Sequence, residues 1–324
     1  MSDNIILLFH STDGRDLLSF RRLGNVKPAI FEKLLVFLKR EFDIIALREM
    51  VEVVSGRKKS DSRLLALTFD DGPKSYAVNA APLMKSMDIP STCFLITDCV
   101  DDREIYWRYL FNYCIHSGNE TVLAELIDRA YGVPVPGDEI ISFTRKHFSR
   151  DANKRVVEGI LKNIITDEEY RKKENDLFLS SADLDKLKRE PLVDFGIHTA
   201  THPVMTHLSD DEIDVEIRKS LEFYKERIGA GMPMFSIPFG RLHKDYDERT
   251  VISAQRQGIE VVLSAYGGDN RQGQPLHNLR RISINEEMLA GGNDSFRKLI
   301  DKLSSVPEYE DLEKRLDNAM LSAR

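Results

Sequence analysis

The sequence contains few cysteines, and their spacing argues against two classes of protein. Cys93, Cys99 and Cys114 are the three cysteines among 324 residues. They form neither the disulfide framework of a small secreted domain nor a paired C-x-x-C metal site. We expect Cys93 and Cys114 to pack in the core, and a reducing cytoplasm to be the location of the protein.

Long apolar runs are also missing. No stretch approaches the roughly 20 apolar residues of a membrane-spanning helix. Residues 5–9 form an apolar run near the start, but it is too short for the core of a signal peptide, and no basic segment precedes it. The sequence therefore predicts no integral membrane segment, which agrees with a cytoplasmic location.

An excess of positive charge is missing as well. The chain has 46 Lys and Arg against 53 Asp and Glu, which gives a formal net charge of -7. The field of the whole chain therefore repels the phosphates of nucleic acids and anionic membrane surfaces. We expect no nucleic-acid partner, whereas a local basic pocket for a phosphorylated ligand is compatible with this charge.

Strand-like and helix-like stretches alternate along most of the chain. Buried strands are expected to end near residues 9, 69, 96 and 197, with helical apolar stripes between them. This alternation is typical of an α/β architecture with a largely parallel sheet. Further strands are expected at Ile44, Ile45 and Leu47, and within 234–239, 259–263 and 282–284.

Residues 98–190 lack this alternation and show mainly helical spacing, with a break at 132–137. We expect a helical insertion that divides the sheet-forming part into residues 1–97 and 191–300, followed by a helical tail at 301–324. The insertion is interpreted as a lid, a substrate-selecting module, an oligomerisation surface or a cap without a chemical role. The sequence alone leaves these four alternatives open.

One motif joins two carboxylates to a sharp turn. The sequence Thr-Phe-Asp-Asp-Gly-Pro at 68–73 follows the apolar run 64–67. Adjacent residues at a strand end point in different directions, so Asp70 and Asp71 can do different work in one cleft, one binding a metal and one accepting a proton. The alternative is a surface turn, because these residue types are common in turns.

The second motif holds two imidazoles. His198 and His202 are four residues apart, but Pro203 disfavours a helix at His202. A strand end that continues into a loop fits the pair better. Two His and one carboxylate form a plausible site for zinc or another divalent metal with open positions for water and substrate.

These motifs together resemble the polysaccharide deacetylases of carbohydrate esterase family four, the NodB-homology domain. Thr-Phe-Asp-Asp-Gly, His-Thr-x-x-His-Pro and Ile-Pro-Phe-Gly at 237–240 occur in the family's order. The flanking segments 7–10, 88–94 and 279–282 also resemble family motifs. The resemblance covers residues 1–97 and 191–285, and it implies a distorted, incomplete (β/α) barrel of seven strands.

The resemblance also implies roles for individual residues. Asp70 corresponds to the general base, and Asp71, His198 and His202 correspond to the metal ligands. Zn²⁺ is the expected metal, with Co²⁺, Ni²⁺, Mn²⁺ and Fe²⁺ as alternatives. The substrate cleft is expected to be shaped by three consecutive residues, Pro238, Phe239 and Gly240.

Two family features are not visible in the sequence. Many members carry an Arg two residues before the proline to orient the base, and here Ser236 stands at that position. Arg241 and Arg281 are the candidates to replace it. The late motif with the general-acid His is also missing, so His277 is the expected acid. His10 is expected to line the cleft and is a second candidate, as is His243.

The function that follows is removal of an N-acetyl group from an acetamido sugar, either a sugar nucleotide or a lipid-linked glycan intermediate. One alternative keeps the metal chemistry but acts on another linear amide or transfers the acyl group. Another is a carbohydrate-binding member of the fold without catalysis. The complete set of metal ligands together with a base argues against that last alternative.

Overall fold

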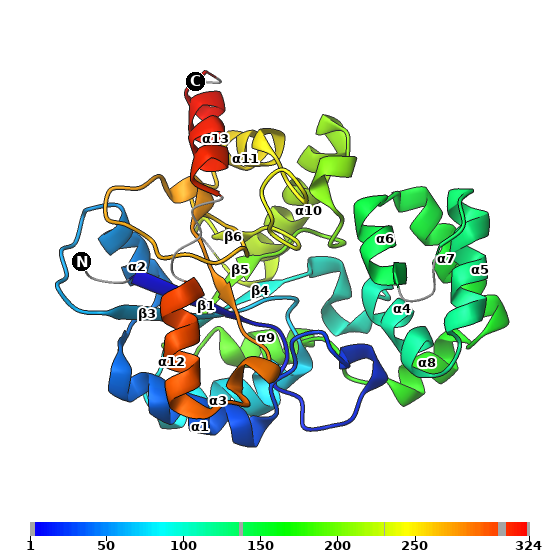
Figure 1. The fold of residues 1–324 in the computed structure, drawn as a ribbon, viewed down its shortest axis with the longest axis horizontal. Helices are drawn as coiled ribbons and strands as arrows, with labels where there is room; N and C mark the ends of the chain where they lie inside the picture. Colours follow the sequence, from blue (N-terminus) through cyan, green and yellow to red (C-terminus); the bar gives the residue numbers. More distant parts are fainter. Residues whose placement is uncertain (1–3, 136–138, 230, 304–308, 323–324) are drawn as a thin grey trace.

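The computed structural model of the chain describes residues 4–135, 139–229, 231–303 and 309–322. Its centre is a sheet whose strands all run parallel, in the order β7-β6-β5-β4-β3-β1-β8, with β2 paired to the start of β3 (Figure 1). The strands are β1 Asn4–Phe9, β2 Asp43–Ile44, β3 Leu64–Phe69, β4 Ser91–Leu95, β5 Val193–Ile197, β6 Phe235–Ser236, β7 Val262–Leu263 and β8 Ile282–Ser283. The seven strands of this path form the curled, incomplete (β/α) barrel that the sequence predicts.

The central strands β1, β3 and β4 are buried along their whole length because helices and the interior of the barrel cover both faces. All six residues of β1 and of β3 are buried. Ile5 and Leu7 join one apolar cluster, whereas Ile6 between them joins a second cluster that includes residues of α2. This alternation is the period of two expected of a strand.

The pairing register brings polar residues to one edge of the sheet. β1 pairs with β3 from Asn4 opposite Leu64 to Phe9 opposite Phe69. His10 and Asp70 therefore leave their strands at the same level. β4 pairs with β5 up to Leu95 opposite Ile197, so the segment after β5 leaves the sheet at this edge as well.

Helices connect and cover the strands. Those outside the segment between β4 and β5 are α1 Pro28–Glu41, α2 Leu47–Val54, α3 Ala81–Ser86, α10 Asp210–Arg227, α11 Glu248–Arg256, α12 Gly292–Leu303 and α13 Glu310–Ser322. A capping box starts α10, because Ser209 and Glu212 each bond to the other's backbone N–H. No helix within the described ranges is long and apolar enough to cross a membrane.

The chain between β4 and β5 is helical. It contains α4 Trp107–His116, α5 Glu120–Tyr131, α6 Ile140–Lys146, α7 Arg150–Asn163, α8 Asp167–Lys173 and α9 Ser181–Leu187. Figure 1 shows α4 to α8 gathered on one side of the sheet. Gly132 ends α5 in the left-handed conformation, at the start of the expected break. Part of that break, residues 136 and 137, lies outside the described residues.

One local prediction is wrong. Leu47 was expected to extend a short strand with Ile44 and Ile45, but β2 ends at Ile44 and Leu47 begins α2. Leu47, Met50 and Val54 are buried on one side of that helix. Helical spacing therefore prevails over the local strand preference of the isoleucines.

Gly196 in β5 provides a test of the packing at the core of the barrel. A Cβ at this position would lie 2.4 Å from Phe94 Cδ1 and 2.7 Å from the Met234 carbonyl oxygen. We expect Gly196→Ala to lower the free energy of unfolding by about 1–3 kcal/mol, measured by denaturant titration. Gly14→Ala is the matched control, because its Cβ meets Pro28 at an ordinary 3.7 Å. Equal stability of the two variants would contradict the described packing.

Candidate functional site

The carboxyl ends of β3 and β5 bring the two sequence motifs together. Asp70 and Asp71 follow β3, and His198 follows β5. His202 lies on a loop that continues from His198, in agreement with the helix-disfavouring effect of Pro203. Such an edge, at the carboxyl ends of parallel strands, is where α/β folds place their ligand sites.

Asp71, His198 and His202 converge in a buried position. One nitrogen or oxygen from each lies within 4.8 Å of the corresponding atoms of the other two. The Nε2 atoms of His198 and His202 lie 3.5 and 3.6 Å from Asp71 Oδ1. Two imidazoles and one carboxylate are a donor set suited to zinc or another first-row divalent metal.

Hydrogen bonds orient the two imidazoles. His198 Nδ1 lies 2.7 Å from the Ser236 carbonyl oxygen, and because a carbonyl can only accept, Nδ1 carries the proton. His202 Nδ1 lies 2.8 Å from the Tyr106 hydroxyl. Contacts of this kind fix the ring and leave Nε2 available to a metal. Burial also lowers the pKa of His202, which keeps it neutral.

Asp71 gives the best evidence that the residues fit a cation. Its Oδ2 accepts a hydrogen bond of 2.9 Å from the Tyr109 hydroxyl, whereas its Oδ1 is buried and has no hydrogen-bond partner among the described residues. A buried carboxylate oxygen without a partner is energetically costly. Oδ1 is also the atom that faces the two Nε2 atoms, so a divalent cation between them would satisfy it.

Asp70 is held by a different set of contacts. The Arg281 guanidinium donates to both of its oxygens, Nη1 to Oδ1 and Nη2 to Oδ2, each at 2.8 Å. The Ser236 hydroxyl donates to Oδ2 at 2.9 Å. Burial alone would raise the pKa of Asp70, but Arg281 and His198 outweigh it and lower this pKa to about 2. The carboxylate is therefore ionised across the neutral range.

The structure selects between the two candidate arginines. Arg281 is completely buried, and its Nε donates to the Ser264 carbonyl oxygen at 2.7 Å. Its Nη2 also donates to the Ser236 hydroxyl at 2.7 Å. Ser236, at the sequence position where many family members carry an arginine, therefore contacts Arg281 directly. Arg241 instead pairs with Asp245, 3.1 Å away.

Several residues of the site have an unusual backbone conformation. Asp71, Thr199, His202 and Phe239 have φ values of 70°, 65°, 58° and 59°. Residues other than glycine rarely adopt this left-handed region, and such strain gathers at functional sites because the surrounding structure maintains it. Gly72 continues the turn after Asp71 with φ of 70°, where a Cβ would lie 2.9 Å from Leu95 Cδ2.

A cavity of about 220 Å³ opens beside these residues. Its wall includes His10 and Phe239, as predicted for the cleft, together with Asp70, His198 and His202. Burial lowers the pKa of His10, although Asp71 and Asp70 oppose this in part.

Pro238 and Gly240 are placed differently, because both are buried and neither is among the residues that line this cavity. Gly240 lets the chain pass Ala265 closely, since a Cβ on it would lie 2.5 Å from the Ala265 nitrogen.

The structure does not bring His277 to this cavity. His277 lies in a short 3₁₀ helix at Leu276–Asn278, and its Nε2 is 2.8 Å from Asp317 Oδ1 of α13. It lines a different cavity, between the segment 273–277 and the C-terminal helix. The sequence expectation rested on the position of His277 just before residues 278–281. His277 does not reach the site because the 3₁₀ turn that carries it faces α13 and not the carboxyl ends of the strands.

Glu216 is a functional-site residue that the sequence reasoning missed. It lies on α10 with 1% of its surface exposed. Its Oε2 accepts from the backbone N–H groups of Ala200 and Thr201 at 3.0 and 2.9 Å, and its Oε1 from the Thr201 hydroxyl and Arg150. It thereby fixes the loop between His198 and His202. The signal was present, because Glu216 interrupts the apolar stripe of its helix.

Tyr106 and Tyr109 were also missed. Tyr106 directly precedes α4 and Tyr109 lies in its first turn, in the segment between β4 and β5, and both are buried. The helical spacing of apolar residues in this segment does not show where a hydroxyl group is directed.

Comparison with known proteins gave one family. A family model described as polysaccharide deacetylase matches residues 57–262. No curated protein sequence matches the chain.

Solved structures of similar fold cover nearly the whole chain. IcaB from Ammonifex degensii is 16% identical with a TM-score of 0.62, and the match covers 94% of this chain and 98% of that one. The Streptococcus pyogenes deacetylase PplD, solved in complex with acetate, is 17% identical with a TM-score of 0.60 and coverages of 93% and 98%. The BpsB deacetylase domain from Bordetella bronchiseptica is 15% identical with a TM-score of 0.55 and coverages of 88% and 98%. At these identities the similarity concerns the fold.

The role of Glu216 can be tested by removing its charge. Glu216→Gln keeps one uncharged oxygen, which cannot serve the two backbone N–H groups and also the Thr201 hydroxyl and Arg150, so we expect the free energy of unfolding to fall by about 1–3 kcal/mol. The amides of Ala200 and Thr201 should also exchange hydrogen faster. Glu222→Gln, exposed on the same helix and paired with Arg218, is the control and should change stability by about 0.5 kcal/mol or less. Unchanged exchange at Ala200 and Thr201 would show that Glu216 does not hold the loop.

Proposed function

Because this chain belongs to the polysaccharide deacetylase family, which makes it a hydrolase of carbon–nitrogen amide bonds, we propose that it removes the N-acetyl group of an acetamido sugar. The observation that carries the proposal is the unpartnered Asp71 Oδ1 facing two oriented imidazoles, beside a second carboxylate fixed by Arg281. The paired roles of the two carboxylates are what metal-assisted hydrolysis requires.

Asp71, His198 and His202 are the proposed metal ligands, and Zn²⁺ is the metal that their two nitrogens and one oxygen favour. When bound, such a metal polarises an acyl carbonyl and makes water a better nucleophile. Co²⁺, Ni²⁺, Mn²⁺ and Fe²⁺ accept the same donors. Tyr106 and Tyr109 hold two of the three ligands in place.

Asp70 is the proposed general base. Hydrolysis forms a bond between the water oxygen and the acetyl carbon and breaks the bond from that carbon to the sugar nitrogen. Asp70 takes one proton from the water, and Arg281 with Ser236 holds its carboxylate toward the site. Products are acetate and a free amine on the sugar.

The leaving nitrogen needs a proton, and the groups on the cavity wall limit its source. His277 is absent from this wall, and burial favours the neutral form of His10. We propose that Asp70 delivers to the nitrogen the proton that it took from water. His10 then acts as a hydrogen-bonding residue for the substrate. In this route a single proton passes from water to Asp70 and then from Asp70 to the amine nitrogen.

Substitutions of Asp70 and His198 separate the two roles. Asp70→Asn should still bind zinc but lose acetate release by about 10²-fold to 10⁴-fold, because the proton acceptor is removed. It also leaves the Arg281 charge without its partner, so a thermal melt must show that the variant is folded. His198→Ala should lose both zinc and activity. Zinc content by elemental analysis and acetate release from N-acetylated amino sugars are the measurements, with exposed Asp61→Asn as control. Full activity in Asp70→Asn would refute its role as base.

His10→Gln tests the proton route. Glutamine still forms hydrogen bonds but cannot donate a proton as an acid. We expect a higher KM and a fall in kcat of about tenfold or less, with the shape of the pH profile retained. A loss of kcat of about 10²-fold or more, together with loss of the alkaline limb of that profile, would instead identify His10 as the general acid.

A further inference from the structure

The cavity beside the proposed metal site has an excess of positive charge. Arg22, Arg108 and Arg145 line it, and Asp70 is the one carboxylate among the residues that the structure shows lining it. Asp70 is already neutralised by Arg281. The oxyanion formed in hydrolysis of an acetamido group would already face the divalent metal, so the further cations on the wall point to an anionic group elsewhere in the substrate.

Two of these arginines have no carboxylate partner. Arg145 pairs with Asp245, but Arg22 and Arg108 form no ion pair among the residues that the structure describes. The Arg108 guanidinium lies 5.1 Å from the centre of the Phe239 ring, and its buried Nε has no hydrogen-bond partner there. The aromatic ring fixes the guanidinium without neutralising it.

Arg22 is presented by a loop held in one conformation. Asn112 of α4 donates to the Arg21 carbonyl oxygen at 2.9 Å, directly before Arg22. Glu174 accepts from the backbone N–H groups of Leu18 and Ser19. The loop therefore meets the helical segment between β4 and β5 directly before Arg22.

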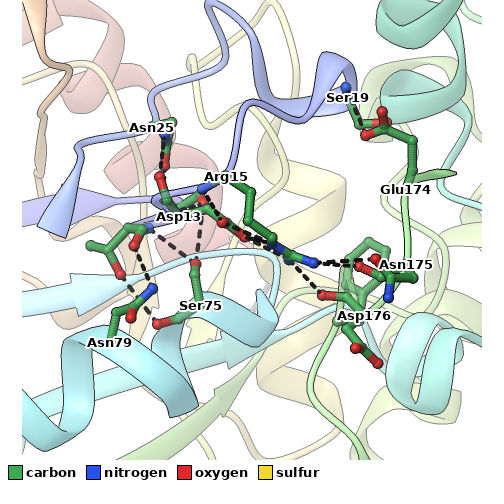
Figure 2. Close-up of polar contacts among 12 residues, drawn as sticks. Asp13, Arg15, Ser19, Asn25, Ser75, Asn79, Glu174, Asn175 and Asp176 are labelled. Carbon is green, nitrogen blue, oxygen red and sulfur yellow. Dashed lines mark hydrogen bonds and ion pairs between the residues drawn. The ribbon is translucent and has the colours of Figure 1, made fainter.

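Figure 2 shows how the start of this loop is anchored. Asp13 pairs with Arg15, whose guanidinium also donates to the carbonyl oxygens of Asn175 and Asp176. Asn25 accepts from the Asp13 N–H at 2.8 Å. Arg22 itself has a left-handed φ of 56°, a conformation that this anchoring maintains.

Arg22 also stands between two cavities. A second, outer cavity of about 740 Å³ shares Arg22, Gly24 and Asn285 with the cavity at the metal site. Of its charged residues, Arg15 and Arg21 pair with aspartates, whereas Lys27, Glu286 and Glu287 form no ion pair among the described residues. Arg22 therefore places an unpaired positive charge where a ligand would pass from one cavity into the other.

We propose that the substrate is an acetamido sugar linked through a phosphoryl group to a carrier. The sugar occupies the cavity at the metal site, the phosphoryl oxygens lie against Arg22 and Arg108, and the carrier extends into the outer cavity. Arginine binds phosphate through charge-assisted, often bidentate hydrogen bonds. A phosphoryl group bridges two parts of a molecule, whereas a sugar carboxylate ends it, so the junction position favours phosphate. This inference rests on the proposed deacetylation.

The test compares acetate release by the zinc-loaded full chain from matched substrates. These are N-acetylglucosamine and N-acetylgalactosamine, each free, as the 1-phosphate and as a nucleoside diphosphate ester, and N-acetylglucosaminuronic acid. We expect kcat/KM for the phosphoryl substrates to exceed that for the free sugars by about tenfold or more. A uronic acid that reacts faster than both phosphoryl forms would overturn the choice of phosphate.

Variants show whether the arginines cause this preference. Arg22→Gln and Arg108→Gln should each lower the phosphoryl-to-neutral ratio about tenfold, and Arg108→Lys should restore part of it. Arg129→Gln on α5, exposed and paired with Glu125, is the control. An unchanged ratio in both glutamine variants would overturn the inference.

A binding measurement separates this inference from the proposed function. If no substrate releases acetate, deacetylation of these sugars is refuted, and calorimetry with inorganic diphosphate then tests the anion site alone. Binding that weakens about tenfold in Arg22→Gln and Arg108→Gln, at unchanged zinc content, supports the anion site. If both variants bind diphosphate as tightly as the native chain does, the metal alone accounts for the binding, and the anion site is overturned.

Discussion

The buried ion pair between Asp70 and Arg281 is the constraint on which the rest of the site depends. Both side chains are at most 3% exposed, and a charge of either sign left alone at this depth would be costly. Arg281 leads into β8 and Asp70 follows β3, so the pair joins the two strands on either side of β1. Because Asp70 must face Arg281, the next residue, Asp71, is directed to the two imidazoles.

The helical segment between β4 and β5 takes part in the site that this pair organises. Tyr106 and Tyr109 touch His202 and Asp71, and Arg150 of α7 reaches Glu216 behind the histidine loop. The segment therefore contacts the proposed metal ligands, which favours a part in the site over a cap without a chemical role. Its hydrogen bonds set the orientation of groups that the barrel strands only bring close together.

Residues that come directly after strands could be predicted from the sequence, whereas residues that act across the fold could not. Asp70, Asp71 and His198 follow apolar runs, so their common location follows from parallel strands. Arg281 was identified only as one of two candidates. Its partner Asp70 is 211 positions away, and no local pattern distinguishes a buried guanidinium from an exposed one.

Sequence reasoning missed Glu216 and misplaced His277 for the same physical reason. Glu216 acts through the face of a helix, and His277 turns toward α13 between β7 and β8. Both outcomes depend on tertiary contacts that hydrophobic periodicity does not encode. The strand ends fix where the backbone emerges, but side-chain partners decide what each polar group does there.

Charge pairing elsewhere in the chain makes the unpaired Arg108 of the cavity informative. Arg145, Arg150 and Arg280 each reach a largely buried carboxylate, as Arg281 does. The fold thus supplies an acidic partner wherever a guanidinium must be buried for structural reasons. Arg108 is partly buried against Phe239 without such a partner. Since stability does not account for its unpaired charge, an anion that arrives with the substrate is the more economical explanation.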